Sequence, residues 1–200
     1  LIEYVSNDGL EIPAFLYRPN DIGDGKTPLV IYARANTKGL HVRGFYPYIQ
    51  YWVHLGYTVI APQVRGSAGL GKQYEFLNYG DWGGGDIDDF AYGAYYLAEK
   101  GLIDLDEVVM QGGSTGGYFV LAMTFRYPDL LSAAVCFYGP PDLVDMYDIS
   151  SGAGLPDAVD VVGGDRGGPD MAPEHWQGRS PIYNLDKIKT PTLLLWGDRD

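Results

Sequence analysis

The sequence predicts a three-layer α/β domain with a mostly parallel central sheet. Short apolar runs alternate along the chain with segments whose apolar residues recur at helical spacing, which is typical of strand–helix–strand units. Most of these runs are apolar at consecutive positions, as in strands that are buried on both faces of a parallel sheet. Glycine (28 residues) and proline (13 residues) separate the segments.

Length and composition indicate a single domain over residues 1–200. The chain has 200 residues, of which 46% are hydrophobic and 20% charged, enough for one substantial core. No run approaches the length of a membrane-spanning helix, and no basic, apolar leader precedes the first expected strand. The net charge of -12 would repel nucleic acid and an anionic membrane, so neither is an expected partner.

The expected strands begin with a hairpin. Residues 3–5 and 11–17 form two strands joined across Asn7-Asp8-Gly9, a sequence that favours a tight turn. The later strands are continuous apolar runs. They cover residues 29–33, 57–61, 108–111, 133–138 and 192–196.

Three helices are expected between these strands. Residues 47–55 carry one apolar stripe and end at Gly56, a favourable position for a left-handed cap. Residues 86–100 start at Asp86, which we expect to be the N-cap, and have an apolar face. Residues 115–126 are apolar nearly all round and stop before Pro128, which predicts a buried central helix.

Residues 140–185 show neither pattern. They are rich in Gly, Pro and Asp, and we expect them to form an irregular excursion over the active-site face of the sheet. The acidic residues Asp142, Asp145 and Asp148 recur at helical spacing there, which we interpret as a solvated face rather than a ligand site.

The sequence contains no residue pattern that is typical of a metal or cofactor site. Cys136 is the single cysteine and lies in an apolar run, so we expect a buried, inert thiol. The absence of a disulfide framework favours a cytoplasmic location. Asp86, Asp88 and Asp89 have the pattern of a helix start, and no His or Cys cluster has ligand spacing, so we expect neither a metal nor another cofactor.

The strongest motif is Gly112-Gly113-Ser114-Thr115-Gly116, which lies between an apolar run and the expected central helix. It fits the Gly-x-Ser-x-Gly elbow, in which a tight strand-to-helix turn exposes a nucleophilic serine. The glycines leave room for the strained turn, and the Thr115 N–H at the helix start can donate to an oxyanion. A phosphate-binding loop is the alternative, but both nucleotide fingerprints fail here.

A catalytic serine needs a base that is oriented by a carboxylate. In the α/β-hydrolase arrangement the acid follows a late strand and the histidine comes after it. Residues 192–196 are the expected late strand. Asp200 is therefore the candidate acid, with Asp198 as the second choice.

Several further segments accompany the elbow in a fixed order along the chain. They are Ser6-Asn7-Asp8-Gly9 with Ile12-Pro13-Ala14, Arg65-Gly66-Ser67-Ala68-Gly69-Leu70-Gly71, Asp81-Trp82-Gly83-Gly84-Gly85-Asp86, Ser180-Pro181-Ile182, and Ile188-Lys189-Thr190-Pro191. Together with the elbow, these segments resemble the catalytic domain of the prolyl oligopeptidase family of serine peptidases, which includes dipeptidyl peptidases and acylaminoacyl peptidases. The resemblance implies an α/β-hydrolase fold and hydrolysis of peptide bonds through an acyl-enzyme on Ser114, with Asp200 as the triad acid.

The second oxyanion donor departs from the family pattern. Members carry His-Gly-Gly or Tyr-Gly-Gly after the strand that matches residues 29–33, whereas this chain reads Tyr32-Ala33-Arg34-Ala35-Asn36. The donor could be the backbone N–H of Ala35 or Asn36, the Tyr32 hydroxyl or the Arg34 side chain.

The catalytic base also departs from the pattern, because the family places its histidine after the acid. His41, His54 and His175 all precede Asp200, so a base drawn from them would need the wrong chain order. We expect a partial α/β-hydrolase domain whose last strand, last helix and histidine lie outside these residues. The resemblance also allows an N-terminal β-propeller or a homo-oligomer partner.

Two other functions remain open. A carboxylesterase would use the same fold, elbow and triad, since these do not distinguish small acyl esters from peptides. A catalytically incomplete fragment or binding module is the alternative that is not an enzyme, because a serine without its base is a weak nucleophile.

Overall fold

The computed structural model describes residues 1–20, 22, 25–34, 39–152 and 159–199. Within these residues the chain forms a seven-stranded sheet with the order β1-β2-β4-β3-β5-β6-β7. The strands are β1 (Ile2–Val5), β2 (Glu11–Tyr17), β3 (Thr27–Ala33), β4 (Thr58–Pro62), β5 (Ile103–Gly113), β6 (Ala133–Phe137) and β7 (Thr192–Leu195).

The sheet is mostly parallel, as the sequence predicts. The strand β2 runs antiparallel to both β1 and β4, whereas β4, β3, β5, β6 and β7 are mutually parallel. The predicted hairpin joins β1 and β2, and Gly9 adopts a φ of 89°, which its turn requires. The parallel strands finish at one edge of the sheet, so the loops that follow them meet there.

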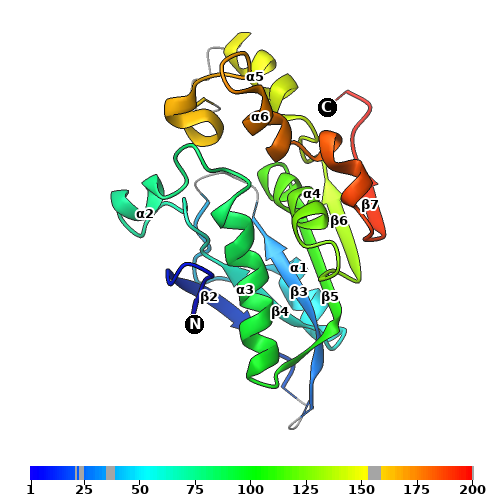
Figure 1. Cartoon of the computed structure of the whole chain (residues 1–200). Helices are drawn as coiled ribbons and strands as arrows, with labels where there is room; N and C mark the ends of the chain where they lie inside the picture. Colours follow the sequence, from blue (N-terminus) through cyan, green and yellow to red (C-terminus); the bar gives the residue numbers. More distant parts are fainter. Residues whose placement is uncertain (21, 23–24, 35–38, 153–158, 200) are drawn as a thin grey trace.

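Helices cover both faces of the sheet (Figure 1). The helices α3 and α4 lie on one face and α1 lies on the other. The helices are α1 (Pro47–His54), α2 (Lys72–Phe76), α3 (Gly85–Glu99), α4 (Thr115–Arg126), α5 (Leu143–Gly152) and α6 (Pro173–Arg179), with shorter turns at η1 (Val159–Gly163), η2 (Gly164–Arg166) and η3 (Pro181–Lys187). None of the helices in the described part of the chain is long and apolar enough to cross a membrane.

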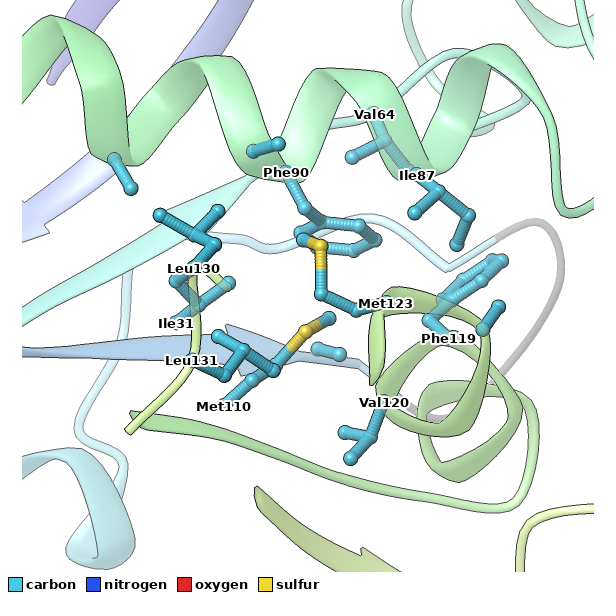
Figure 2. Close-up of a cluster of buried hydrophobic side chains, with 14 of the residues drawn as sticks. Ile31, Val64, Ile87, Phe90, Met110, Phe119, Val120, Met123, Leu130 and Leu131 are labelled. Carbon is cyan, nitrogen blue, oxygen red and sulfur yellow. The ribbon is translucent and has the colours of Figure 1, made fainter. Parts of the chain in front are cut away.

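Side chains of β3 point alternately to the two faces of the sheet and so contribute to the core on both faces. Ile31 faces α3 and α4, whereas the adjacent Val30 packs with Ile49 of α1. On the first face, Phe90 of α3 and Met123 of α4 point toward one another over the sheet (Figure 2). Burying one such side chain stabilises the fold by about 1.5–3 kcal/mol.

Most predicted bounds lie within two residues of the observed ones, but the start of β5 and the N-cap of α3 were predicted wrongly. The strand β5 begins at Ile103 instead of residue 108, because residues 104–107 are polar or exposed and carry no apolar run. Asp86 is not the N-cap of α3, since Gly84 holds that position. The glycines at 83–85 turn the chain into the helix earlier, and the Asp86 carboxylate instead accepts the Gly83 N–H at 3.1 Å.

The segment that was expected to be irregular, residues 140–185, contains α5, η1, η2, α6 and part of η3 in its described portion. Its helices are short, so hydrophobic periodicity gives little signal for them. Figure 1 shows α5 and α6 beyond the edge of the sheet where the parallel strands finish.

Candidate active site

Ser114 lies on a strained turn between β5 and α4. Its φ of 53° and ψ of -123° are unusual for a residue with a side chain, and the residue is exposed. The backbone is held on both sides, because Ser114 N donates to Phe137 O at 2.9 Å and Tyr118 N donates to Ser114 O at 3.0 Å. The geometry therefore presents a serine hydroxyl at the carboxyl edge of the sheet, as the elbow motif predicts.

Glycines let three backbones meet at this turn. A Cβ on Gly112 would lie 2.4 Å from Gly116 O, and a Cβ on Gly116 would lie 2.4 Å from Ala33 O at the end of β3. Gly117 and Gly139 face each other in the same way, since a Cβ on Gly139 would lie 2.2 Å from Gly117 C. The first turn of α4 is thus wedged between the ends of β3 and β6.

The first residue of α4 offers a backbone N–H beside Ser114. Thr115 is its first residue, so no carbonyl within the helix can accept its backbone N–H. The helix dipole also places partial positive charge at this end. A carbonyl oxygen that gains negative charge beside Ser114 would be stabilised there.

The other oxyanion candidates lie around the end of β3. Tyr32 contributes to a cavity of about 310 Å³ with Gly112, Gly113 and Tyr138. Burial raises the pKa of the Tyr32 hydroxyl, so it stays protonated and able to donate at neutral pH. Arg34 is half-buried, and its backbone carbon would lie 2.9 Å from a Cβ on Gly116. Ala35 and Asn36 lie outside the described residues.

The candidate acids follow β7. Asp200 lies outside the described residues, so its side chain cannot be placed. Asp198 is exposed in the turn after β7. Because β6 lies between β7 and β5, this turn is two strands away from the one that carries Ser114.

The three histidines have separate environments. His41 is 4% exposed, and burial together with the Arg34 charge lowers its pKa to about 4. His54 is exposed in the last turn of α1. His175 in α6 has its Nε2 2.7 Å from Val162 O. Within the described ranges, no hydrogen bond joins a histidine ring to Ser114.

A cluster of buried charges, which the sequence does not reveal, fixes the adjoining loops. Asp89 of α3 is fully buried and accepts hydrogen bonds from Arg65 Nη2 at 2.7 Å and Ser6 Oγ at 2.6 Å. Arg65 Nη1 also donates to Asp8 at 2.8 Å. Asp88 accepts a hydrogen bond from Asn7 Nδ2 at 3.0 Å. It also accepts hydrogen bonds from Arg126, the last residue of α4, and from Tyr127, which follows that helix. The charges therefore tie the N-terminal hairpin to α3 and α4.

Residues 43–200 match the family model described as the prolyl oligopeptidase family. The chain is 27% identical over 209 residues to dipeptidyl aminopeptidase BIII of Pseudoxanthomonas mexicana. This alignment covers 100% of this chain and 30% of that protein. It is 25% identical over 204 residues to the acylamino-acid-releasing enzyme of Sus scrofa, in an alignment that covers 99% of this chain and 28% of that protein.

Solved structures agree in fold. A puromycin hydrolase superposes with a TM-score of 0.86 at 25% identity, over 96% of this chain and 29% of that one. An acylaminoacyl peptidase of Pyrococcus horikoshii gives a TM-score of 0.85 at 23% identity, over 98% of this chain and 31% of that one. The chain thus spans less than a third of the length of the proteins that it resembles.

Proposed function

The chain belongs to the prolyl oligopeptidase family, and from this premise we propose that it supplies the nucleophile of a serine peptidase that cleaves oligopeptides. The observation that carries the proposal is the strained, exposed Ser114 at the N-terminus of α4. Strain of this kind is kept where the surrounding structure holds it for function.

In the proposed reaction, Ser114 Oγ attacks the scissile carbonyl while a histidine takes the hydroxyl proton. The tetrahedral intermediate collapses, the C–N bond breaks, and the histidine returns the proton to the leaving amine. Water then hydrolyses the acyl-enzyme by the same steps. The Thr115 N–H is one donor to the oxyanion. The second is the backbone N–H of Ala35 or Asn36, the Arg34 side chain or the Tyr32 hydroxyl.

We propose that Asp200 orients the histidine and that the histidine lies outside these 200 residues. Two observations support this. His41 is buried beside the rings of Tyr32 and Tyr46, and His175 Nε2 lies 2.7 Å from Val162 O. The relatives are also more than three times as long as the part that this chain matches, so they have room for the missing base.

Peptides are the proposed substrates, because the relatives named above are peptidases. This favours amide hydrolysis over a carboxylesterase. A β-propeller in the rest of a longer polypeptide, or a second copy of the protein, would restrict the site to short peptides.

A fluorophosphonate probe, which labels activated serines, tests the proposal on the 200-residue chain and on the full-length protein that contains it. We expect labelling of the full-length protein at Ser114, and its loss in Ser114→Ala with unchanged thermal unfolding. The peptidase rate should fall by several orders of magnitude in that variant. Ser132→Ala, which removes a hydroxyl just before β6, is the control and should label normally.

Absence of labelling at Ser114 in both proteins would reject the hydrolase assignment. Labelling of the long protein alone would identify the 200 residues as catalytically incomplete.

A further inference from the structure

The cavity at the turn that carries Ser114 is lined mainly by aromatic rings. Its volume is about 310 Å³, which is enough for a small ligand group, and none of the described residues that line it is charged. Four of its walls are Tyr32, Tyr48, Phe137 and Tyr138. Such a lining favours an apolar or aromatic group.

The cavity begins one residue from the nucleophile. Gly113 precedes Ser114 and lines the cavity. Ser114 N also donates to the carbonyl oxygen of Phe137, a second wall, at 2.9 Å. Two further walls, Tyr48 and Tyr138, are exposed, so the cavity is reached from solvent. A group that is bonded to Ser114 therefore lies next to the opening.

Backbone strain holds the Tyr138 ring at this opening. Tyr138 has a φ of 40° and, with Ser114, is one of the two residues other than glycine with a positive φ in the described part of the chain. Its N–H donates to Leu195 O at 2.8 Å. A Cβ on Gly113 would lie 3.0 Å from Tyr138 Oη, so the glycine keeps the space beneath the hydroxyl open. Strain of this kind is kept where function needs a side chain in one place.

One amide side chain, Gln111, lies among these rings. It pairs with Tyr32 of β3 and precedes Ser114 by three residues, about 10 Å along β5. Trp52 Nε1 of α1 donates to Gln111 Oε1 at 2.9 Å, and because an indole only donates, the acceptor must be the amide oxygen. Gln111 Nε2 has no hydrogen-bond partner within the described residues, so its two N–H groups can donate to a ligand in the cavity.

We propose that this cavity binds the side chain of the residue whose carbonyl Ser114 attacks, and that Gln111 selects an aromatic side chain with an acceptor at its far end, as in tyrosine. The inference rests on the proposed peptidase function and names its substrate class. The aromatic walls pack against the substrate ring, and Gln111 Nε2 donates to the phenol oxygen. Trp52 is a positioning residue, because it acts on the substrate only through the amide that it orients.

The rings and the amide contribute separately. Burial of an aromatic side chain among apolar walls corresponds to roughly a ten- to hundredfold gain in binding over alanine. A hydrogen bond between neutral groups adds roughly a two- to tenfold gain, which separates tyrosine from phenylalanine. A donor to the oxyanion, in contrast, acts on every substrate alike.

The test measures kcat/KM of the full-length protein on Ala-Ala-anilide, Ala-Phe-anilide and Ala-Tyr-anilide, which differ only in the residue that is attacked. We expect Phe to exceed Ala roughly ten- to hundredfold, and Tyr to exceed Phe roughly two- to tenfold. Gln111→Met should abolish the preference for Tyr over Phe and keep that for Phe over Ala. Trp52→Phe, which leaves the amide unoriented, should weaken the preference for Tyr.

Gln177→Met, at an exposed position of α6, is the matched control and should keep both ratios. Thermal unfolding confirms that each variant is folded. Equal rates on the three anilides in the wild type would overturn the inference. A preference for Tyr over Phe that survives in folded Gln111→Met would also overturn it.

A binding measurement separates this inference from the proposed function. Calorimetry on the full-length Ser114→Ala variant measures the affinities of the three anilides without turnover and with Gln111 and Trp52 intact. We expect the affinity to fall in the order Tyr, Phe, Ala. Equal affinities would overturn the inference even where the fluorophosphonate probe labels Ser114 in the wild type, so the two proposals can fail separately.

Discussion

Replacing Gly139 by alanine tests how the turn that carries Ser114 is held. Gly139 follows β6 and faces the first turn of α4. An added Cβ would lie 2.2 Å from Gly117 C, 2.5 Å from Tyr118 N and 2.7 Å from Gly117 Cα. All three neighbours are backbone atoms of α4, so no side chain can rotate away. The helix or the end of β6 has to move.

The size of the shift follows from these distances. Ordinary contact begins at 3.4 Å, so the closest pair must separate by about 1.2 Å. Overpacking of this kind destabilises by about 1–3 kcal/mol, and backbone against backbone belongs at the upper end. For a domain of this length that unfolds independently, about 3 kcal/mol corresponds to a fall in Tm of roughly 6–12 °C. A misplacement of about 1 Å at a reacting centre lowers the rate by roughly a hundredfold.

The assay pairs thermal unfolding with the rate of fluorophosphonate labelling at Ser114 in the full-length protein. Gly178→Ala in α6 is the matched control, because a Cβ there meets nothing within 4 Å. It should leave labelling unchanged and raise the stability slightly, as Gly→Ala does inside a helix. Wild-type labelling together with wild-type Tm in Gly139→Ala would refute the reasoning that this close approach positions Ser114.

Two further predictions concern buried charges. Arg65→Met should lower the free energy of unfolding by about 3–5 kcal/mol in urea titrations, because it leaves the fully buried Asp89 carboxylate without its cation. Asp8 is the second, half-exposed aspartate that pairs with Arg65, so Asp8→Asn should lower the free energy of unfolding less. Equal losses in the two variants would contradict this account. Burial raises the pKa of the Asp86 carboxyl from 3.8 to about 7. Between these two pH values the folded state therefore binds a proton that the unfolded state has released. The contribution of this proton to the free energy of unfolding is complete below about pH 4 and is lost as the pH rises to 7. Between pH 5 and pH 7 the wild type should therefore lose up to about 3 kcal/mol relative to Asp86→Asn, and parallel pH profiles would contradict the assignment.

Sequence patterns predicted the parts of the molecule that are governed by local chemistry. The elbow around Ser114 is an example, because its glycines, the preceding strand and the following helix all lie within one short segment. The central helix α4 was predicted with its observed bounds, since a strand–turn signal opens it and Pro128 follows it.

Long-range partners could not be predicted in the same way. Asp89 has the pattern of a residue near a helix start, and nothing near it in sequence indicates that Arg65 and Ser6 meet its carboxylate. The same limit applies to Arg34, whose buried Nη1 has no hydrogen-bond partner in the part of the chain that the structure describes. The strand β5 was predicted too short because residues 104–107 have no apolar pattern.

The ties between the hairpin and α3 have a consequence for the order of folding. Ser6 and Asn7 find their aspartates 83 and 81 residues later, and β2 pairs with β4 instead of with β3. During synthesis the hairpin therefore leaves the ribosome long before any of these partners exists, and an isolated hairpin is marginally stable in water. The two strands of the hairpin should therefore become protected from hydrogen exchange only after α3 has formed, because their closing contacts await that helix.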